Sequence, residues 1–383
     1  MTSNTPVRSM TRVRHGAAVV PGAPAPWDRL QYRLFHPALF ADTPEERQTG
    51  QIPPDRDAAP WPVVILLNGI NVGPEGYRWL AERLAAAGIA TITFTHVSNV
   101  AADQRGLSPG LDLEALGVAQ FGSRPSATTV GPLLAALAAE QADGPLAGLL
   151  DLERIALGGH SAGGTVALLN ADPEWFPGVR ATFSYAGHTM PAAVLGHPDG
   201  TVLPVAADTP ALVLGGSDDG VVAASAVRYG RGDAPLGIDD HDPITETFRR
   251  GTSAAGSALG IIRGAGHLSF CDPVDPTTAR GFLETDDDPG GPGRLDRPGG
   301  TGAGADRADR ADRADRADRA DGTGALDAAA RRDLIGSLVI AFCTEHLCSG
   351  ARGSSLSKLA TAPGLARFEL RSTADVREAS HAG

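Results

Sequence analysis

The sequence is poor in cysteine and has no long apolar run. These two absences argue against a disulfide-stabilised protein and against a membrane-spanning one. Its three cysteines, Cys271, Cys343 and Cys348, are too few for a disulfide framework. A bridge between Cys343 and Cys348 is conceivable, but we expect these thiols to be reduced. No apolar run reaches the roughly 20 residues of a membrane-spanning helix, so we expect no membrane insertion. Because residues 7–20 lack the apolar core of a signal peptide, we expect a cytoplasmic protein.

Basic charge is also scarce. The chain has 33 Lys and Arg against 45 Asp and Glu, which gives a formal net charge of −12. Because phosphate binding depends mainly on Lys and Arg, this balance disfavours nucleic acids and anionic membranes as partners. The sequence contains no Walker loop, no dinucleotide-binding glycine fingerprint and no metal-binding His or Cys spacing. We therefore expect neither a cofactor nor a metal.

The most informative motif is Gly159-His160-Ser161-Ala162-Gly163. It follows an apolar strand pattern at residues 155–157 and precedes a helical pattern at residues 165–169. Glycines two positions to either side of a serine relieve collisions at a strained strand-to-helix turn and expose its hydroxyl. A serine hydroxyl also needs a neighbouring base, and the base needs a carboxylate. The motif therefore predicts a nucleophile, Ser161, although an ordinary tight-turn serine is the alternative.

An acid and a base follow in the order that such a nucleophile requires. The apolar strand at residues 211–214 leads to Asp218 and Asp219, and the strand at residues 260–262 leads to His267. The carboxyl ends of parallel strands meet at one edge of a sheet, so we expect these side chains to converge. We predict His267 as the base and Asp219 as the acid, with Asp218 as the alternative acid.

Three further histidines are weaker candidates for the base. His188 precedes the predicted acid in the chain, and His241 follows no predicted strand. His160 lies inside the elbow, where we expect it to pack or to form hydrogen bonds within the turn.

Two backbone N–H groups are predicted to form an oxyanion hole, which stabilises the negative charge of a tetrahedral intermediate. One is the N–H of Ala162, directly after the nucleophile. The other is the N–H of Ile70, in the tight turn Asn68-Gly69-Ile70-Asn71 that follows the strand at residues 63–67. Gly69 would let this backbone approach a substrate closely.

Together these segments resemble the α/β-hydrolase superfamily, most closely its dienelactone-hydrolase-like and chlorophyllase- or polyester-hydrolase-like branches. The resemblance spans roughly residues 28–285 and resumes at about 326–348, and it implies a Ser161, Asp219 and His267 triad. Two features depart from the family. Asn68 stands where a histidine is common, and Ser161 stands where dienelactone hydrolases proper have a cysteine.

Strand patterns alternate with helical patterns along most of the chain, which predicts an α/β fold with a mostly parallel sheet and helices on both faces. Five divisions are expected: a flexible arm with one edge strand (1–27), an α/β-hydrolase domain (28–284), a low-complexity insertion of Ala-Asp-Arg repeats (285–325), a closing helix of the hydrolase domain (326–348) and a polar tail (349–383).

The predicted function is cleavage of a small-molecule carboxylic ester through an acyl-enzyme intermediate. An acyltransferase with the same triad is one alternative. A catalytically silent ligand-binding protein on the same fold is another, because a fold does not guarantee an activity. The acyl and alcohol parts of the substrate and the oligomeric state are not predicted, because they depend on surfaces that the sequence does not define.

Overall fold

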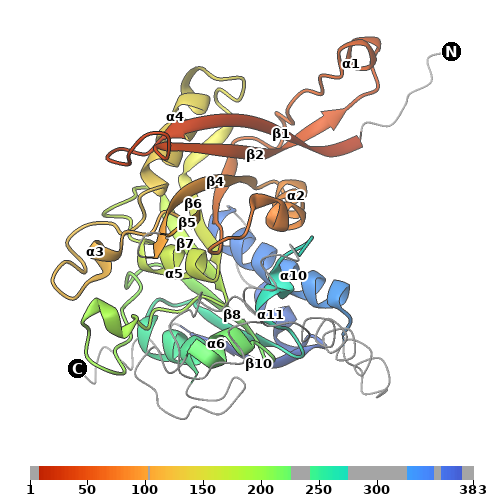
Figure 1. The fold of residues 1–383 in the computed structure, drawn as a ribbon. Coiled ribbons are helices and arrows are strands. Elements are labelled where there is room, and N and C mark those ends of the chain that lie inside the picture. The colour runs from red at the N-terminus through yellow and green to blue at the C-terminus, as the bar shows by residue number, and fades with distance from the viewer. Residues whose placement is uncertain (1–7, 102–103, 226–241, 275–325, 349–354, 373–383) are drawn as a thin grey trace, which may run out of the picture.

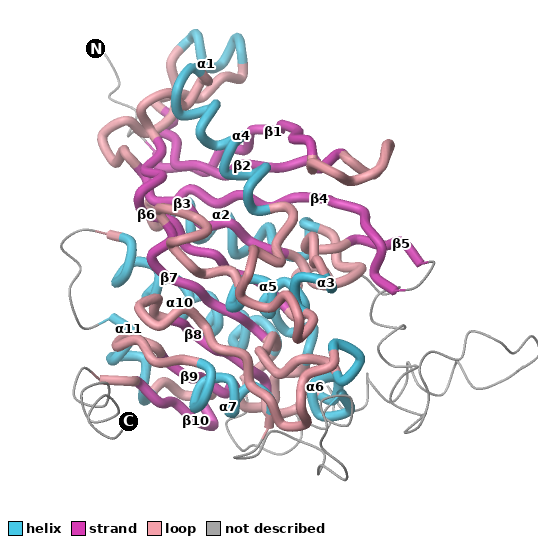
Figure 2. Tube along the Cα trace, turned by 90° about the vertical axis from the view of Figure 1, so that its left-hand side faces the viewer, coloured by secondary structure: helices cyan, strands magenta, loops and turns pink. Residues whose placement is uncertain are grey.

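The computed structural model describes residues 8–101, 104–225, 242–274, 326–348 and 355–372. Within these residues, ten strands form one sheet in the order β1-β2-β4-β3-β6-β7-β8-β9-β10, with β5 paired to β4 (Figures 1 and 2). The strands are β1 (Arg8–Val19), β2 (Arg29–Phe40), β3 (Trp61–Leu67), β4 (Ala90–Ala101), β5 (Gln104–Leu107), β6 (Leu150–His160), β7 (Val179–Tyr185), β8 (Ala211–Gly216), β9 (Ala258–Ile262) and β10 (Leu365–Leu370). The predicted insertion at 285–325 lies outside the described residues.

Helices connect these strands and cover the sheet. The α-helices are α1 (Pro44–Thr49), α2 (Arg78–Ala86), α3 (Leu113–Leu116), α4 (Val130–Asp143), α5 (Ala162–Leu169), α6 (Gly220–Ser225), α7 (Pro243–Glu246), α10 (Ala328–Leu347) and α11 (Ser355–Lys358). Shorter helical turns are η1 (Pro74–Tyr77), η2 (Ala193–Leu195), η4 (Thr247–Gly251), η5 (His267–Phe270) and η6 (Leu359–Thr361). Among these described helices, none is both long and apolar enough to cross a membrane.

The centre of the sheet is parallel and is buried on both faces. The six strands β4, β3, β6, β7, β8 and β9 run parallel to one another. Successive side chains of a strand point to opposite faces. On β3, Val64 and Leu66 therefore belong to the same apolar cluster as α2 and α10, whereas Val63 and Ile65 belong to that of α4 and α5. Because both faces of β3 are buried, its sequence is one continuous apolar run.

The expectation of a mostly parallel sheet is corrected by the structure, because the sheet is mixed. At one edge β1 pairs antiparallel with β2, and β2 pairs antiparallel with β4. At the other edge β10 pairs antiparallel with β9. Strand β5 lies off this path and pairs antiparallel with the end of β4. The short connection from β1 to β2 allows only an antiparallel return, since a parallel return needs a long crossover. Strand β10 lies in the segment that the sequence assigned to a polar tail.

Helix α10 closes the fold over the central strands. It begins after Asp327, whose side chain accepts a hydrogen bond from the N–H of Ala330 at 2.7 Å. Its buried side chains include Ile335, Leu338 and Phe342, which join the apolar cluster on the α2 face of the sheet. The helix therefore supports the side of the sheet on which η5 also packs.

Candidate active site

Ser161 lies at the sharp turn between β6 and α5. Its backbone has φ 53° and ψ −125°, a conformation that side-chain-bearing residues rarely adopt. The N–H of Ser161 donates to the carbonyl of Tyr185 at 2.9 Å, and the Ser161 carbonyl accepts from the N–H of Thr165 at 3.0 Å. These bonds attach the strained turn to β7 and to the first turn of α5, so the conformation is held from both sides.

Close packing explains the two outer glycines of the motif. A Cβ atom at Gly159 would lie 2.4 Å from the carbonyl carbon of Gly163. A Cβ atom at Gly163 would lie 2.3 Å from the carbonyl oxygen of Leu67, at the end of β3. In both cases the opposing atoms are backbone atoms, which cannot rotate away. Glycine is therefore required where α5 crosses the ends of β3 and β6.

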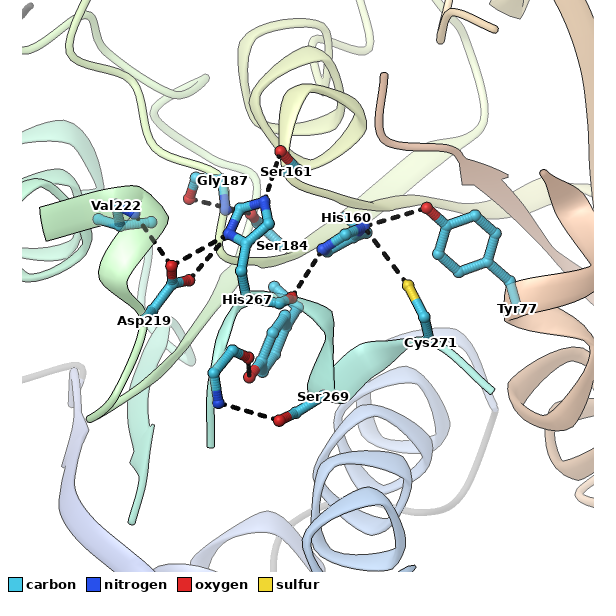
Figure 3. Close-up of polar contacts among 12 residues, drawn as sticks. Tyr77, His160, Ser161, Ser184, Gly187, Asp219, Val222, His267, Ser269 and Cys271 are labelled. Atoms are coloured by element: carbon cyan, nitrogen blue, oxygen red, sulfur yellow. Dashed lines mark hydrogen bonds and ion pairs between the residues drawn. The ribbon is translucent and has the colours of Figure 1, made fainter. Parts of the chain in front are cut away.

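The three predicted side chains lie within hydrogen-bonding distance of one another (Figure 3). His267 Nε2 is 3.0 Å from Ser161 Oγ. On the other side of the ring, His267 Nδ1 is 3.1 Å from Asp219 Oδ1 and 3.0 Å from Asp219 Oδ2. Asp219 and His267 are buried, and Ser161 is half-buried. Since a carboxylate only accepts, Nδ1 carries the proton and Nε2 is left to accept from the serine hydroxyl.

The structure distinguishes the two adjacent aspartates. The Asp219 carboxylate faces His267 and also accepts from the N–H of Val222 at 3.0 Å. The Asp218 carboxylate instead accepts a hydrogen bond from the exposed hydroxyl of Ser217 at 2.6 Å. Asp219 is therefore the carboxylate that contacts His267, and Asp218 contacts Ser217 in the turn after β8.

The predicted oxyanion donors flank Ser161. A Cβ atom at Gly69 would lie 3.4 Å from Ser161 Cβ, so the turn that carries Ile70 abuts the elbow. Ala162 is the first residue of α5, where an N–H has no acceptor within the helix. Within the described residues, neither the Ile70 N–H nor the Ala162 N–H donates a hydrogen bond to the protein.

The remaining candidate histidines do not occupy the position of the base. The carbonyl of His188 accepts from Thr165 Oγ1 at 2.8 Å, and burial lowers the pKa of the His188 imidazole to about 4. His241 lies outside the described residues. The ring of His160 is buried, but its hydrogen bonds leave the turn and reach Tyr77 and the carbonyl of His267. Of the two expected alternatives for His160, packing is confirmed, since the buried ring stacks on Phe270, whereas its side-chain hydrogen bonds reach beyond the turn.

Sequence reasoning missed Tyr77 as part of this site. The phenol is fully buried, accepts from the N–H of Gly69 at 2.9 Å and contacts His160. A signal was available, because a tyrosine close after a predicted oxyanion loop needs a hydrogen-bond partner when its hydroxyl is buried. Asn68, which directly precedes this loop glycine, donates from Nδ2 to the carbonyl of Gly69 at 2.9 Å.

The described residues contain no group of three or more His, Cys, Asp or Glu side chains arranged to hold a metal. The three cysteines are free thiols. Burial raises the pKa of the Cys271 thiol to about 12, and it also raises the pKa values of Cys343 and Cys348. These thiols are therefore weak nucleophiles at neutral pH.

Neither the models of known protein families nor the curated proteins give a match to this chain. The site places the His267 imidazole within hydrogen-bonding distance of both the Ser161 hydroxyl and the Asp219 carboxylate. Within the described residues, the N–H groups of Ile70 and Ala162 have no protein acceptor. Such an arrangement can activate an oxygen nucleophile and can stabilise an oxyanion.

Proposed function

We propose that this protein is a serine hydrolase of the α/β-hydrolase fold that cleaves a small-molecule carboxylic ester. One observation carries the proposal: the His267 imidazole bridges Ser161 Oγ and Asp219 Oδ2, with both contacts at 3.0 Å. The parallel centre of the sheet supports it as well. Ser161, Asp219 and His267 each follow one of the central parallel strands, namely β6, β8 and β9.

The first half of the reaction forms an acyl-enzyme. Ser161 Oγ attacks the ester carbonyl carbon while its proton passes to His267 Nε2, and the Asp219 carboxylate stabilises the imidazolium. The N–H groups of Ile70 and Ala162 donate to the carbonyl oxygen as it becomes negative. The imidazolium then gives its proton to the alcohol oxygen as the carbon–oxygen bond breaks, so the alcohol departs and the acyl group remains on Ser161.

The second half releases the acid. A water molecule attacks the acyl carbon while His267 takes one of its protons, and the same oxyanion hole holds the second tetrahedral intermediate. When this intermediate collapses, the proton returns to Ser161 Oγ and the carboxylic acid leaves. Acyl transfer to an added alcohol would use the same residues, so analysis of the products with and without that alcohol separates hydrolase from transferase.

A fluorophosphonate probe tests the proposal directly, because it phosphonylates activated serines. The expected result is covalent labelling of the wild-type protein and of Ser217→Ala, with no label on Ser161→Ala. Ser217 is a suitable control because it is a serine in the loop after β8 whose hydroxyl donates to Asp218 and accepts from the N–H of Gly264 at 2.8 Å, rather than bonding to His267. A panel of p-nitrophenyl esters of increasing chain length then measures the acyl preference. An absence of label on folded wild-type protein would contradict the proposal and favour a silent ligand-binding protein.

A further inference from the structure

A second series of hydrogen bonds runs beside the triad and joins the oxyanion loop to the base. Figure 3 shows the part from Tyr77 through His160 to His267. The N–H of Gly69 donates to Tyr77 Oη at 2.9 Å. Tyr77 Oη is 3.0 Å from His160 Nδ1, and His160 Nε2 is 2.9 Å from the carbonyl oxygen of His267. The series touches no reacting atom, since it ends on the backbone of His267 rather than on its imidazole.

The direction of each hydrogen bond follows from the chemistry of the two ends. The His267 carbonyl only accepts, so His160 Nε2 carries the proton and Nδ1 of the neutral ring is an acceptor. Tyr77 must then donate its hydroxyl proton to Nδ1 while its oxygen accepts from Gly69. Burial lowers the pKa of the His160 imidazole to about 3, which keeps the ring neutral at physiological pH. Each donor and acceptor in this series of hydrogen bonds, from Gly69 to the His267 carbonyl, therefore has a partner.

One other polar group faces His160 Nδ1. Cys271 Sγ lies 3.9 Å from this nitrogen, whereas Tyr77 Oη lies at 3.0 Å. A thiol is a weak donor, so the nearer phenol makes the bond. The plane of the ring is supported by Phe270, which stacks on His160 with ring centroids 5.8 Å apart and an interplanar angle of 19°. Packing and hydrogen bonds thus define one orientation for the imidazole.

We propose that His160 and Tyr77 are positioning residues, which hold the oxyanion loop and the general base at a fixed separation on either side of Ser161. His160 is the last residue of β6 and directly precedes Ser161. The series of hydrogen bonds therefore includes the residue that is bonded to the nucleophile through the backbone. Oxyanion donors must lie about 2.7–3.1 Å from the developing charge, and a misplacement of about 1 Å can cost about 100-fold in rate. This inference rests on the proposed hydrolase activity.

The first test compares two buried phenols. Tyr77→Phe removes the link between Gly69 and His160. Tyr185→Phe removes a hydroxyl that donates to the Gly266 carbonyl at 2.8 Å, next to the base but away from the oxyanion loop. We expect Tyr77→Phe to lower kcat for a p-nitrophenyl ester about 10- to 100-fold with little change in KM, because the effect is on transition-state contacts. We expect Tyr185→Phe to lower kcat by less than about threefold. Equal losses of kcat in the two variants would overturn the proposal.

The second test is rescue at residue 160. The side-chain amide of His160→Gln can still donate to the His267 carbonyl, whereas His160→Leu fills the space without a donor. For variants with matched thermal unfolding midpoints, we expect kcat to be about tenfold higher for the glutamine than for the leucine. Equal kcat values would show that the ring only fills space, and they would overturn the positioning role. If neither variant folds, the Tyr77→Phe comparison decides.

Fluorophosphonate labelling of the wild-type protein separates the two possible failures. If the wild type is not labelled, the proposed hydrolase activity fails and the positioning role fails with it. If the wild type is labelled and Tyr77→Phe reacts at the same rate as Tyr185→Phe, only the positioning role fails. A slower reaction of Tyr77→Phe alone supports both.

Discussion

The central and the edge strands of the sheet differ in relative direction, in burial and in whether they lead into the loops of the candidate site. Every residue of central strand β3 is buried, whereas β1 at one edge is mostly exposed or half-buried. The central strands β3, β6, β8 and β9 lead directly into the loops of the candidate site, and the edge strands β1 and β10 lead into none of them. The parallel pairing brings distant carboxyl ends to one place, while the antiparallel edges extend and cover the sheet.

The packing of glycines shows the same contrast. At the centre, Gly163 lies against the backbone of Leu67. At the edge, a Cβ atom at Gly16 would meet only the ring tip of Tyr32, at 2.2 Å. A side chain can turn aside and a backbone carbonyl cannot, so we expect substitutions at the centre to be costly and those at the edge to be tolerated.

The largest expected effect concerns the carboxylate that faces the base. Asp219→Asn should lower kcat/KM for a p-nitrophenyl ester by about three to four orders of magnitude, because an amide no longer holds the required tautomer or stabilises the imidazolium. Asp218→Asn, one residue away, should change kcat/KM by less than about threefold. Steady-state kinetics of both variants measure the difference, and similar losses in the two would contradict the assignment of the acid.

The next expected effect compares a central with an edge glycine. Gly163→Ala should destabilise the protein by about 3 kcal/mol, because the new methyl group overlaps the Leu67 carbonyl. Gly16→Ala should change the free energy of unfolding by less than about 1 kcal/mol, since alanine is better than glycine within a strand and the Tyr32 ring can shift. Urea unfolding followed by circular dichroism measures both values. A larger loss for Gly16→Ala would reverse the contrast drawn between the two regions.

A smaller effect is expected from pH. Burial lowers the pKa of His188 to about 4, below its ordinary value near 6.5, so the unfolded chain binds more protons than the folded one between these values. His188 therefore makes stability fall by about 1 kcal/mol per pH unit as the pH decreases from about 6.5 to 4. His188→Gln should flatten this slope in urea unfolding, whereas His15→Gln, at an exposed position of β1, should not. Unchanged slopes in both variants would argue against a neutral buried imidazole.

The smallest expected effect is at Cys271. Because burial raises the pKa of this thiol to about 12, little thiolate exists at pH 7.5 and alkylation should be slow. N-ethylmaleimide should leave esterase turnover within about twofold of the untreated value, and peptide mass spectrometry should show the half-buried Cys348 reacting before Cys271. Rapid inactivation together with Cys271 modification would contradict the closed packing around His160.

The sequence predicted those parts of the molecule that local patterns encode. The elbow could be predicted because glycine spacing and strained turns are properties of five adjacent residues. The central strands could be predicted because strands buried on both faces are apolar throughout. The antiparallel edge at β10 was missed, although Arg367 and Glu369 alternate with Phe368 and Leu370 there, a pattern typical of a strand with one wet face.

The sequence by itself determined the residue types, their order along the chain and the strands that present them. Only the tertiary structure decided between Asp218 and Asp219, because adjacent residues in a turn point in different directions. It alone also revealed the bond between Tyr77 and His160, which lie 83 residues apart. A hydrogen bond depends on the distance and angle between two groups, and the packing of helices and strands determines both. A contact between residues far apart in the chain therefore produces no periodic pattern in the sequence.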